Sequence, residues 1–187
     1  RGAARRMWRR VDTDHRALAE ARAALRAFAG GVDGAIARVP AALRDHPALW
    51  YERLRWRRRK GRDEGAEEIL FRAPDELGRP KLWWRERHIL ARKALNRGRV
   101  SDAYRLAANH GQIESSSFAE AEWLAGWIAL RFLDDAKAAL DHFVTMYGAV
   151  KYPISRARGA YWVARAMQAL GETDEARGWH HLAARHP

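Results

Sequence analysis

Apolar side chains recur along this chain at helical spacing, and the alternation of polar and apolar residues that is typical of strands is almost absent. Four segments begin with an Ala and place mostly apolar or aromatic residues three, four and seven positions later, which puts them on one helix face. The segments are Ala66/Ile69/Leu70/Ala73, Ala103/Leu106/Ala107/His110, Ala136/Ala139/Leu140/Phe143 and Ala176/Trp179/His180/Ala183. This pattern predicts an all-α protein.

Helix start and stop signals divide the chain into short helices. A first helix runs from Asp12 or Thr13 to about Phe28, and Asp33 is in position to cap a short helix that ends before Pro40. Ser117 and Glu120 have the spacing of a capping box. Further helices are predicted over about 48–60, 64–72, 81–97, 101–109, 117–132, 135–147, 155–170 and 174–185.

The four anchor alanines, Ala66, Ala103, Ala136 and Ala176, lie 37, 33 and 40 residues apart, in the range of helix-hairpin solenoids. Three of them follow a glycine by five residues, as a left-handed residue after a helix would be placed, whereas Arg131 stands at that position before Ala136. We therefore expect a right-handed α-superhelix of stacked antiparallel helix pairs, similar to tetratricopeptide (TPR) repeats. It would form one domain over 1–187, with a less regular part at 1–46 and about four repeats over 47–187.

The charge is strongly positive, at +12 over 187 residues, and most of it comes from Arg. Such a surface suits nucleic acid, acidic glycopeptide or an anionic membrane, although a general preference for Arg in the coding sequence explains it equally well. No apolar run approaches the ~20 residues needed to cross a bilayer. The absence of cysteine excludes disulfides and thiolate chemistry.

Residue patterns that would indicate catalysis or metal binding are missing. The eight histidines are scattered and none belongs to an H-E-x-x-H motif, so we expect no metal site and no cofactor. Glu114-Ser115 resembles the opening of the catalytic motif in lysozyme-like lytic enzymes, but its position in a turn favours a capping role. The basic run 53–62 surrounds Trp56, which suits nucleic acid, yet a solvated helix face is the favoured interpretation. No catalytic residue and no nucleic-acid partner are therefore predicted.

One sector of a predicted helix combines arginine with aromatic residues. Arg158, Tyr161, Trp162 and Arg165 fall close together at helical spacing, and Arg156 lies in the same segment. Rings of this kind stack on sugars while guanidinium groups bind carboxylates. These five residues are the candidate substrate-binding residues, although core packing is the favoured role of Trp162 itself.

Several segments resemble one enzyme family. Residues 49–58, 121–130, 156–166 and 176–187, above all ARGAYWVARA and WHHLAARHP, are similar to the α-superhelical domain of soluble lytic murein transglycosylases of the α-proteobacterial type. The resemblance implies a periplasmic parent enzyme, with a signal peptide upstream, that cleaves the MurNAc–GlcNAc bond of peptidoglycan and forms a 1,6-anhydro product. In that family a lysozyme-like catalytic domain follows the helical domain.

This chain stops at Pro187 and has no counterpart of the catalytic Glu, so the resemblance implies a scaffold without activity of its own. It would guide peptidoglycan glycan strands and contact its own C-terminal catalytic domain, without crossing a membrane. Two alternatives remain open. One is a helical-repeat adaptor that binds protein segments, and the other is an RNA-binding solenoid that uses the basic run.

Overall fold

A computed structural model describes residues 11–73, 78–113 and 116–185. Within these residues the chain forms α-helices and one short 3-10 turn, and no strand. The elements are α2 Thr13–Ala27, α3 Val32–Ala37, η1 Ala41–Leu43, α4 Pro47–Arg59, α5 Asp63–Arg72, α6 Pro80–Asn96, α7 Val100–Ala108, α8 Ser116–Phe132, α9 Ala136–Ala149, α10 Pro153–Leu170 and α11 Thr173–Ala184. The predicted all-α class is confirmed.

Helices α2 to α5 and η1 belong to a first compact unit, which extends to Gly78. The first helix begins where its sequence predicts, because the Asp12 side chain accepts a hydrogen bond from the backbone N–H of His15. The next helix differs from the prediction, since Gly31 in the left-handed conformation precedes α3 and Asp33 lies inside its first turn. Side chains from α2, α3, α4 and the connection after α3 form one core, composed of Leu18, Ala21, Leu25, Val32, Ala35, Val39 and Leu49.

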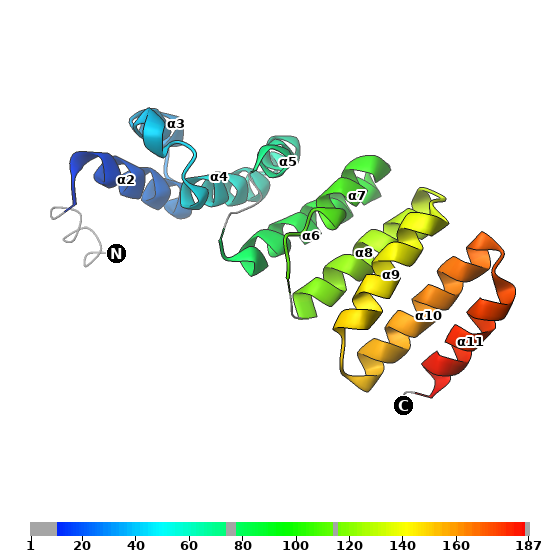
Figure 1. Cartoon of the computed structure of the whole chain (residues 1–187). Coiled ribbons are helices and arrows are strands. Elements are labelled where there is room, and N and C mark those ends of the chain that lie inside the picture. The colour runs from blue at the N-terminus through cyan, green and yellow to red at the C-terminus, as the bar shows by residue number, and fades with distance from the viewer. Residues whose placement is uncertain (1–10, 74–77, 114–115, 186–187) are drawn as a thin grey trace. The chain divides into compact units, whose positions relative to one another are not determined.

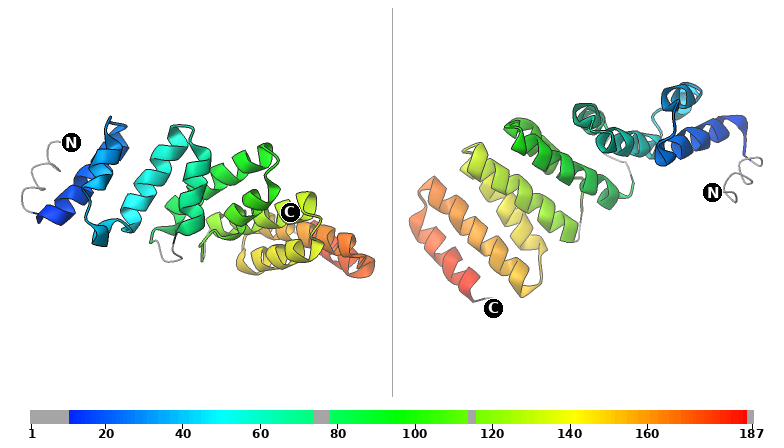
Figure 2. Two further views of the ribbon diagram at one scale, coloured as in Figure 1. Left: turned by 90° about the horizontal axis from the view of Figure 1, so that it is seen from above. Right: turned by 180° about the vertical axis from the view of Figure 1, so that it is seen from behind.

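Helices α6 to α11 form a second compact unit, which begins at Arg79. Each helix packs against the next in the chain, and Figures 1 and 2 show the six side by side in chain order with alternating direction. Contacts between neighbours along the chain dominate, which is the arrangement of a helical-repeat array. The expectation that the whole chain forms a single domain stays a prediction.

The structure corrects the third anchor of the repeat. Ala66, Ala103 and Ala176 are fully buried, but Ala136 is only partly buried and the fully buried alanine of α9 is Ala139. The anchor spacing then becomes 37, 36 and 37 residues. With this correction each anchor also follows a left-handed residue by five positions: Gly61, Gly98, Asp134 and Gly171 have φ of 73°, 75°, 57° and 85°. The left-handed position of the third repeat is therefore Asp134 rather than Arg131.

Other helix boundaries differ from the sequence prediction by one or two residues, and at two of them a predicted capping or stop signal is wrong. Helix α9 continues through Gly148 to Ala149, because a glycine with ordinary helical φ does not end a helix. Helix α8 already begins at Ser116, so the capping box predicted from Ser117 is wrong. The Glu120 carboxylate instead accepts a hydrogen bond from Nε1 of Trp84 on α6.

Candidate binding surface on α8 and α10

Arg158 connects α10 to α8 through an aromatic ring. Its guanidinium carbon lies 4.2 Å from the centroid of the Trp123 ring, within the range of a cation–π contact. Partial burial of the guanidinium lowers the pKa of Arg158, and the carboxylate of Glu120 offsets part of this lowering. The indole thereby supports a guanidinium whose side chain is exposed and makes no ion pair among the described residues.

Tyr161 and Arg165 continue the same surface one and two turns further along α10. The Nη1 group of Arg165 donates a hydrogen bond of 3.1 Å to the Tyr161 hydroxyl. Tyr161 is 40% exposed, and its ring contacts His180 of α11 edge-on. Trp123, Arg158, Tyr161 and Arg165 are called here the α8–α10 face.

The other two candidate residues lie elsewhere. Trp162 packs inside the unit, stacked on Phe143 of α9 with ring centroids 5.5 Å apart. Arg156 lies against α9 instead of α8, where its Nη2 donates to the hydroxyl of Tyr147 and its guanidinium covers that ring at 4.3 Å. Of the five predicted residues, the structure thus brings together Arg158, Tyr161 and Arg165, and it places Trp162 beneath them.

The charged side chains of α10 are all positive. Helix α10 carries three arginines and no acidic residue over its 18 residues. Several acidic residues of the unit stand at the starts of other helices, such as Asp102 on α7, Asp135 before α9 and Asp174 on α11, where they complement the helix dipole. The positive charge of Arg158 and Arg165 therefore remains available to a ligand.

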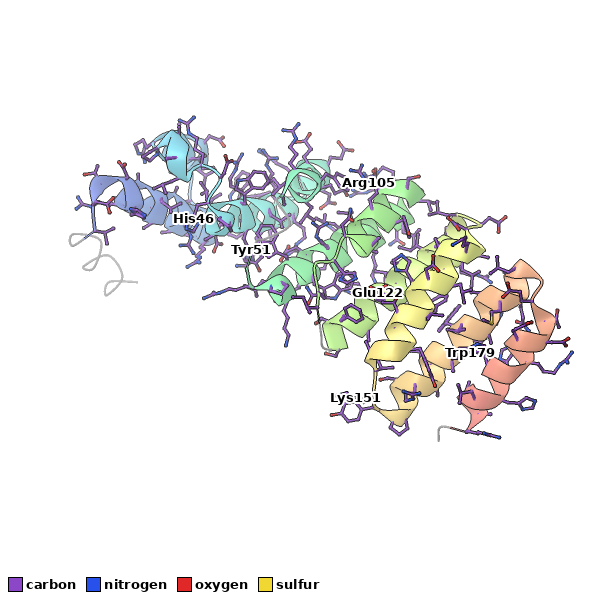
Figure 3. All side chains as sticks on the ribbon, viewed as in Figure 1. His46, Tyr51, Arg105, Glu122, Lys151 and Trp179 are labelled. Carbon is purple, nitrogen blue, oxygen red and sulfur yellow. The ribbon has the colours of Figure 1, made fainter. Side chains whose placement is uncertain are left out.

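A second polar cluster, which the sequence did not predict, lies inside the same unit. The carboxylate of Glu122, which is labelled on α8 in Figure 3, meets Nε2 of His110 at 3.0 Å and Nδ1 of His142 at 2.6 Å. His142 in turn contacts the Tyr104 hydroxyl at 3.0 Å. The cluster joins α7, α8, α9 and the connection after α7. Its only sequence signal is a carboxylate within the apolar run of α8.

Geometry fixes the proton on His110. The backbone N–H of Gln112 donates to Nδ1 of His110 at 2.9 Å, so Nδ1 is the acceptor and Nε2 carries the hydrogen donated to Glu122. Burial alone raises the pKa of Glu122, but the hydrogen bonds from His110 and His142 lower it to about 2. Glu122 is consequently an ionised structural carboxylate, without the raised pKa that a general acid needs.

The basic run of the first unit covers its own aromatic residues. The guanidiniums of Arg59 and Arg62 lie 4.2 Å and 5.1 Å from the ring centroids of Phe28 and Trp56. Trp56 also packs against the core of that unit. The exposed ring that a nucleic-acid base would stack on is thus not available at Trp56.

Within the described residues, no group of three or more His, Asp or Glu side chains is arranged to hold a metal ion. None of the described helices combines the length and apolar character needed to cross a membrane. Glu114 and Ser115, which resemble the lytic-enzyme motif, lie outside the described residues.

Comparison with known proteins gives structural neighbours alone. No family model matches the sequence, and no curated protein matches it. One solved structure, of nearly identical TPR-like repeats from a Podosopora anserina protein assigned as a kinesin light chain, is 18% identical with a TM-score of 0.49, covering 88% of this chain and 90% of that one. A single-substitution variant of the same repeats is 17% identical with a TM-score of 0.49 and covers 93% and 95%. The fold is therefore assigned from the helices and their packing and not from these neighbours.

Proposed function

We propose that the second unit is a helical-repeat binding module, and that its α8–α10 face binds an extended acidic segment of a partner protein. One observation carries the proposal: Arg158 and Arg165 are held on aromatic rings, on a helix without acidic residues and without ion pairs among the described residues. A guanidinium that is already supported by a ring loses less freedom when it binds a carboxylate.

A protein ligand fits this face better than a stack of sugar rings does. Sugar stacking needs a free aromatic face, whereas Trp123 is covered by Arg158 and Trp162 is packed against Phe143. The groups that remain accessible are two guanidiniums and the ring of Tyr161, which suit carboxylates and a small apolar side chain.

The test is fluorescence anisotropy of a labelled acidic peptide, such as alternating Glu and Leu, titrated with the full chain at low salt. We expect binding that weakens with salt, and a loss of about ten-fold or more in affinity for Arg158→Ala/Arg165→Ala. The matched control is Lys137→Ala/Arg177→Ala, which removes the same charge from exposed positions on α9 and α11 that pair with Asp141 and Asp174. Absence of binding by the wild type, or equal losses in both double variants, would overturn the proposal.

A second candidate is the scaffold of a periplasmic lytic transglycosylase that guides glycan strands. Its support is the resemblance in sequence and the combination of Arg with Tyr on one face, since muramyl groups and stem peptides carry carboxylates. Sedimentation with purified sacculi at low and moderate salt tests it. Retention of the wild type, but not of the Arg158/Arg165 variant, supports this candidate, and absence of retention at low salt refutes it.

A further inference from the structure

One acidic residue interrupts the positive surface, and it is firmly positioned. Helix α8 contains two acidic residues, of which Glu122 is buried among histidines and Glu120 keeps 47% of its side chain exposed. Glu120 Oε2 accepts a 3.0 Å hydrogen bond from Nε1 of Trp84, a residue of α6 that is itself buried. The carboxylate is therefore held at the surface by a neutral donor that leaves its charge in place.

His88, a second neighbour of Glu120 from α6, does not neutralise its charge either. His88 Nε2 lies 3.9 Å from Glu120 Oε1, beyond hydrogen-bond distance. Burial lowers the pKa of His88, with Glu120 acting in the opposite direction and Arg92 adding to the lowering. Arg92 also donates to Nε2 of His88 at 3.0 Å, which uses that nitrogen as an acceptor and leaves the ring without a proton there. The second oxygen of Glu120 thus keeps capacity for a ligand cation.

Glu120 on α8 and Arg158 on α10 do not form an ion pair with each other. Each is fixed by an indole, Glu120 by the N–H of Trp84 and Arg158 by the ring face of Trp123, and no ion pair joins them within the described part of the chain. Glu120 and Trp123 lie three residues apart on one face of α8, and Arg158 lies over the Trp123 ring, so the two charges occupy neighbouring parts of one surface. In keeping with this, the carboxylate of Glu120 raises the pKa of Arg158 against the effect of its burial. A carboxylate and a guanidinium fixed in this way match a ligand that carries both a positive and a negative charge.

We infer that the α8–α10 face, together with Glu120, selects peptides of mixed charge: acidic residues bind at Arg158 and Arg165, and a Lys or Arg side chain at one end binds at Glu120. This inference rests on the proposed function and adds direction to it. The basic end of the peptide lies toward α8 and α6 and the acidic part lies along α10. A uniformly acidic ligand places a carboxylate near Glu120 and is disfavoured.

Three labelled peptides of equal length test the selection against the full chain at low salt. The first carries only acidic and neutral residues, and the other two replace a Gln by Lys at the N-terminal or at the C-terminal end. We expect one Lys peptide to bind roughly five-fold more tightly than the acidic peptide, and the other to gain less, which gives the direction. Glu120→Gln removes this preference, while its amide oxygen still accepts from Trp84.

Glu175→Gln, at an exposed acidic position on α11, is the matched control and keeps the preference for the Lys peptide. Equal binding of all three peptides, or a preference that survives Glu120→Gln, overturns the inference and leaves the proposed function standing. Failure of all three peptides to bind overturns both.

Discussion

A Cβ atom added to Gly126 on α8 would lie 2.7 Å from Cε1 of Phe143 on α9, closer than side chains approach one another. Phe143 has no exposed surface and stacks on Trp162, so its ring has no space into which it can withdraw. The α8–α9 interface therefore depends on the absence of a side chain at position 126. A similar contact recurs at Gly159 on α10, where the added Cβ would lie 3.2 Å from the backbone of Tyr147.

Gly126→Ala is expected to destabilise the protein by about 1–3 kcal/mol, because one extra methyl group overpacks a filled contact. Gly178→Ala is the control, since it also lies within a helix but has nothing within 4 Å of the added Cβ. There the change is expected to stabilise by up to about 1 kcal/mol, through lower entropy of the unfolded chain. Urea denaturation measures both, and equal effects at the two positions would contradict the packing argument.

Asp134→Gly is expected to stabilise the protein by about 0.5–1 kcal/mol. Asp134 occupies the left-handed region with φ of 57°, which is strained for a residue with a Cβ and open to glycine. The reciprocal change, Gly171→Ala, forces a Cβ into a left-handed turn with φ of 85° and is expected to cost about 1 kcal/mol. Chemical denaturation of both variants provides the measurement, and effects of the same sign would refute the assignment of equivalent turns.

The sequence predicted the helices because their apolar periodicity and most of their boundaries are local signals. The position of the anchor alanine in the third repeat is not given by such a local signal. Ala136 and Ala139 are both small and share one helix face, and the usual glycine is replaced by Asp134. Only the packing of α9 against its neighbours shows which alanine is buried.

The sequence predicts the part of the candidate surface that lies on α10, but not the residues that other helices contribute to it. The spacing of Arg158, Tyr161 and Arg165 places them on one face of α10, whereas their partners come from other helices. Arg158 covers Trp123, which lies 35 residues earlier in the chain. Contacts between helices depend on how the repeats stack, which a single sequence does not specify.

The stability of the protein is expected to fall in acid because of Glu122. Its pKa is lowered from 4.5 to about 2 in the folded state, so its stabilising contribution is present above pH 4.5 and is lost as the pH falls toward 2. The shift corresponds to a contribution on the order of 3 kcal/mol. Denaturation experiments between pH 2 and 7 measure this effect. We expect Glu122→Gln to be less stable than the wild type at pH 7, and its free energy of unfolding to change less between pH 2 and 4.5. Asp174→Asn, at a side chain that is 86% exposed, is the control and should retain the slope of the wild type.

Ala139→Leu is expected to destabilise the protein by about 1–3 kcal/mol, and Ala136→Leu by clearly less. Ala139 has no exposed surface and lies in the core cluster with Phe143, so a larger side chain has to displace its neighbours. Ala136 is only partly buried at the first position of α9, where a longer side chain can extend toward solvent. Both substitutions add the same atoms to the same helix, which removes differences in helix propensity from the comparison. Thermal and urea denaturation of the two variants therefore show which alanine lies at the contact between helices. A larger loss of unfolding free energy in Ala136→Leu would support anchor spacings of 37, 33 and 40 residues instead of 37, 36 and 37.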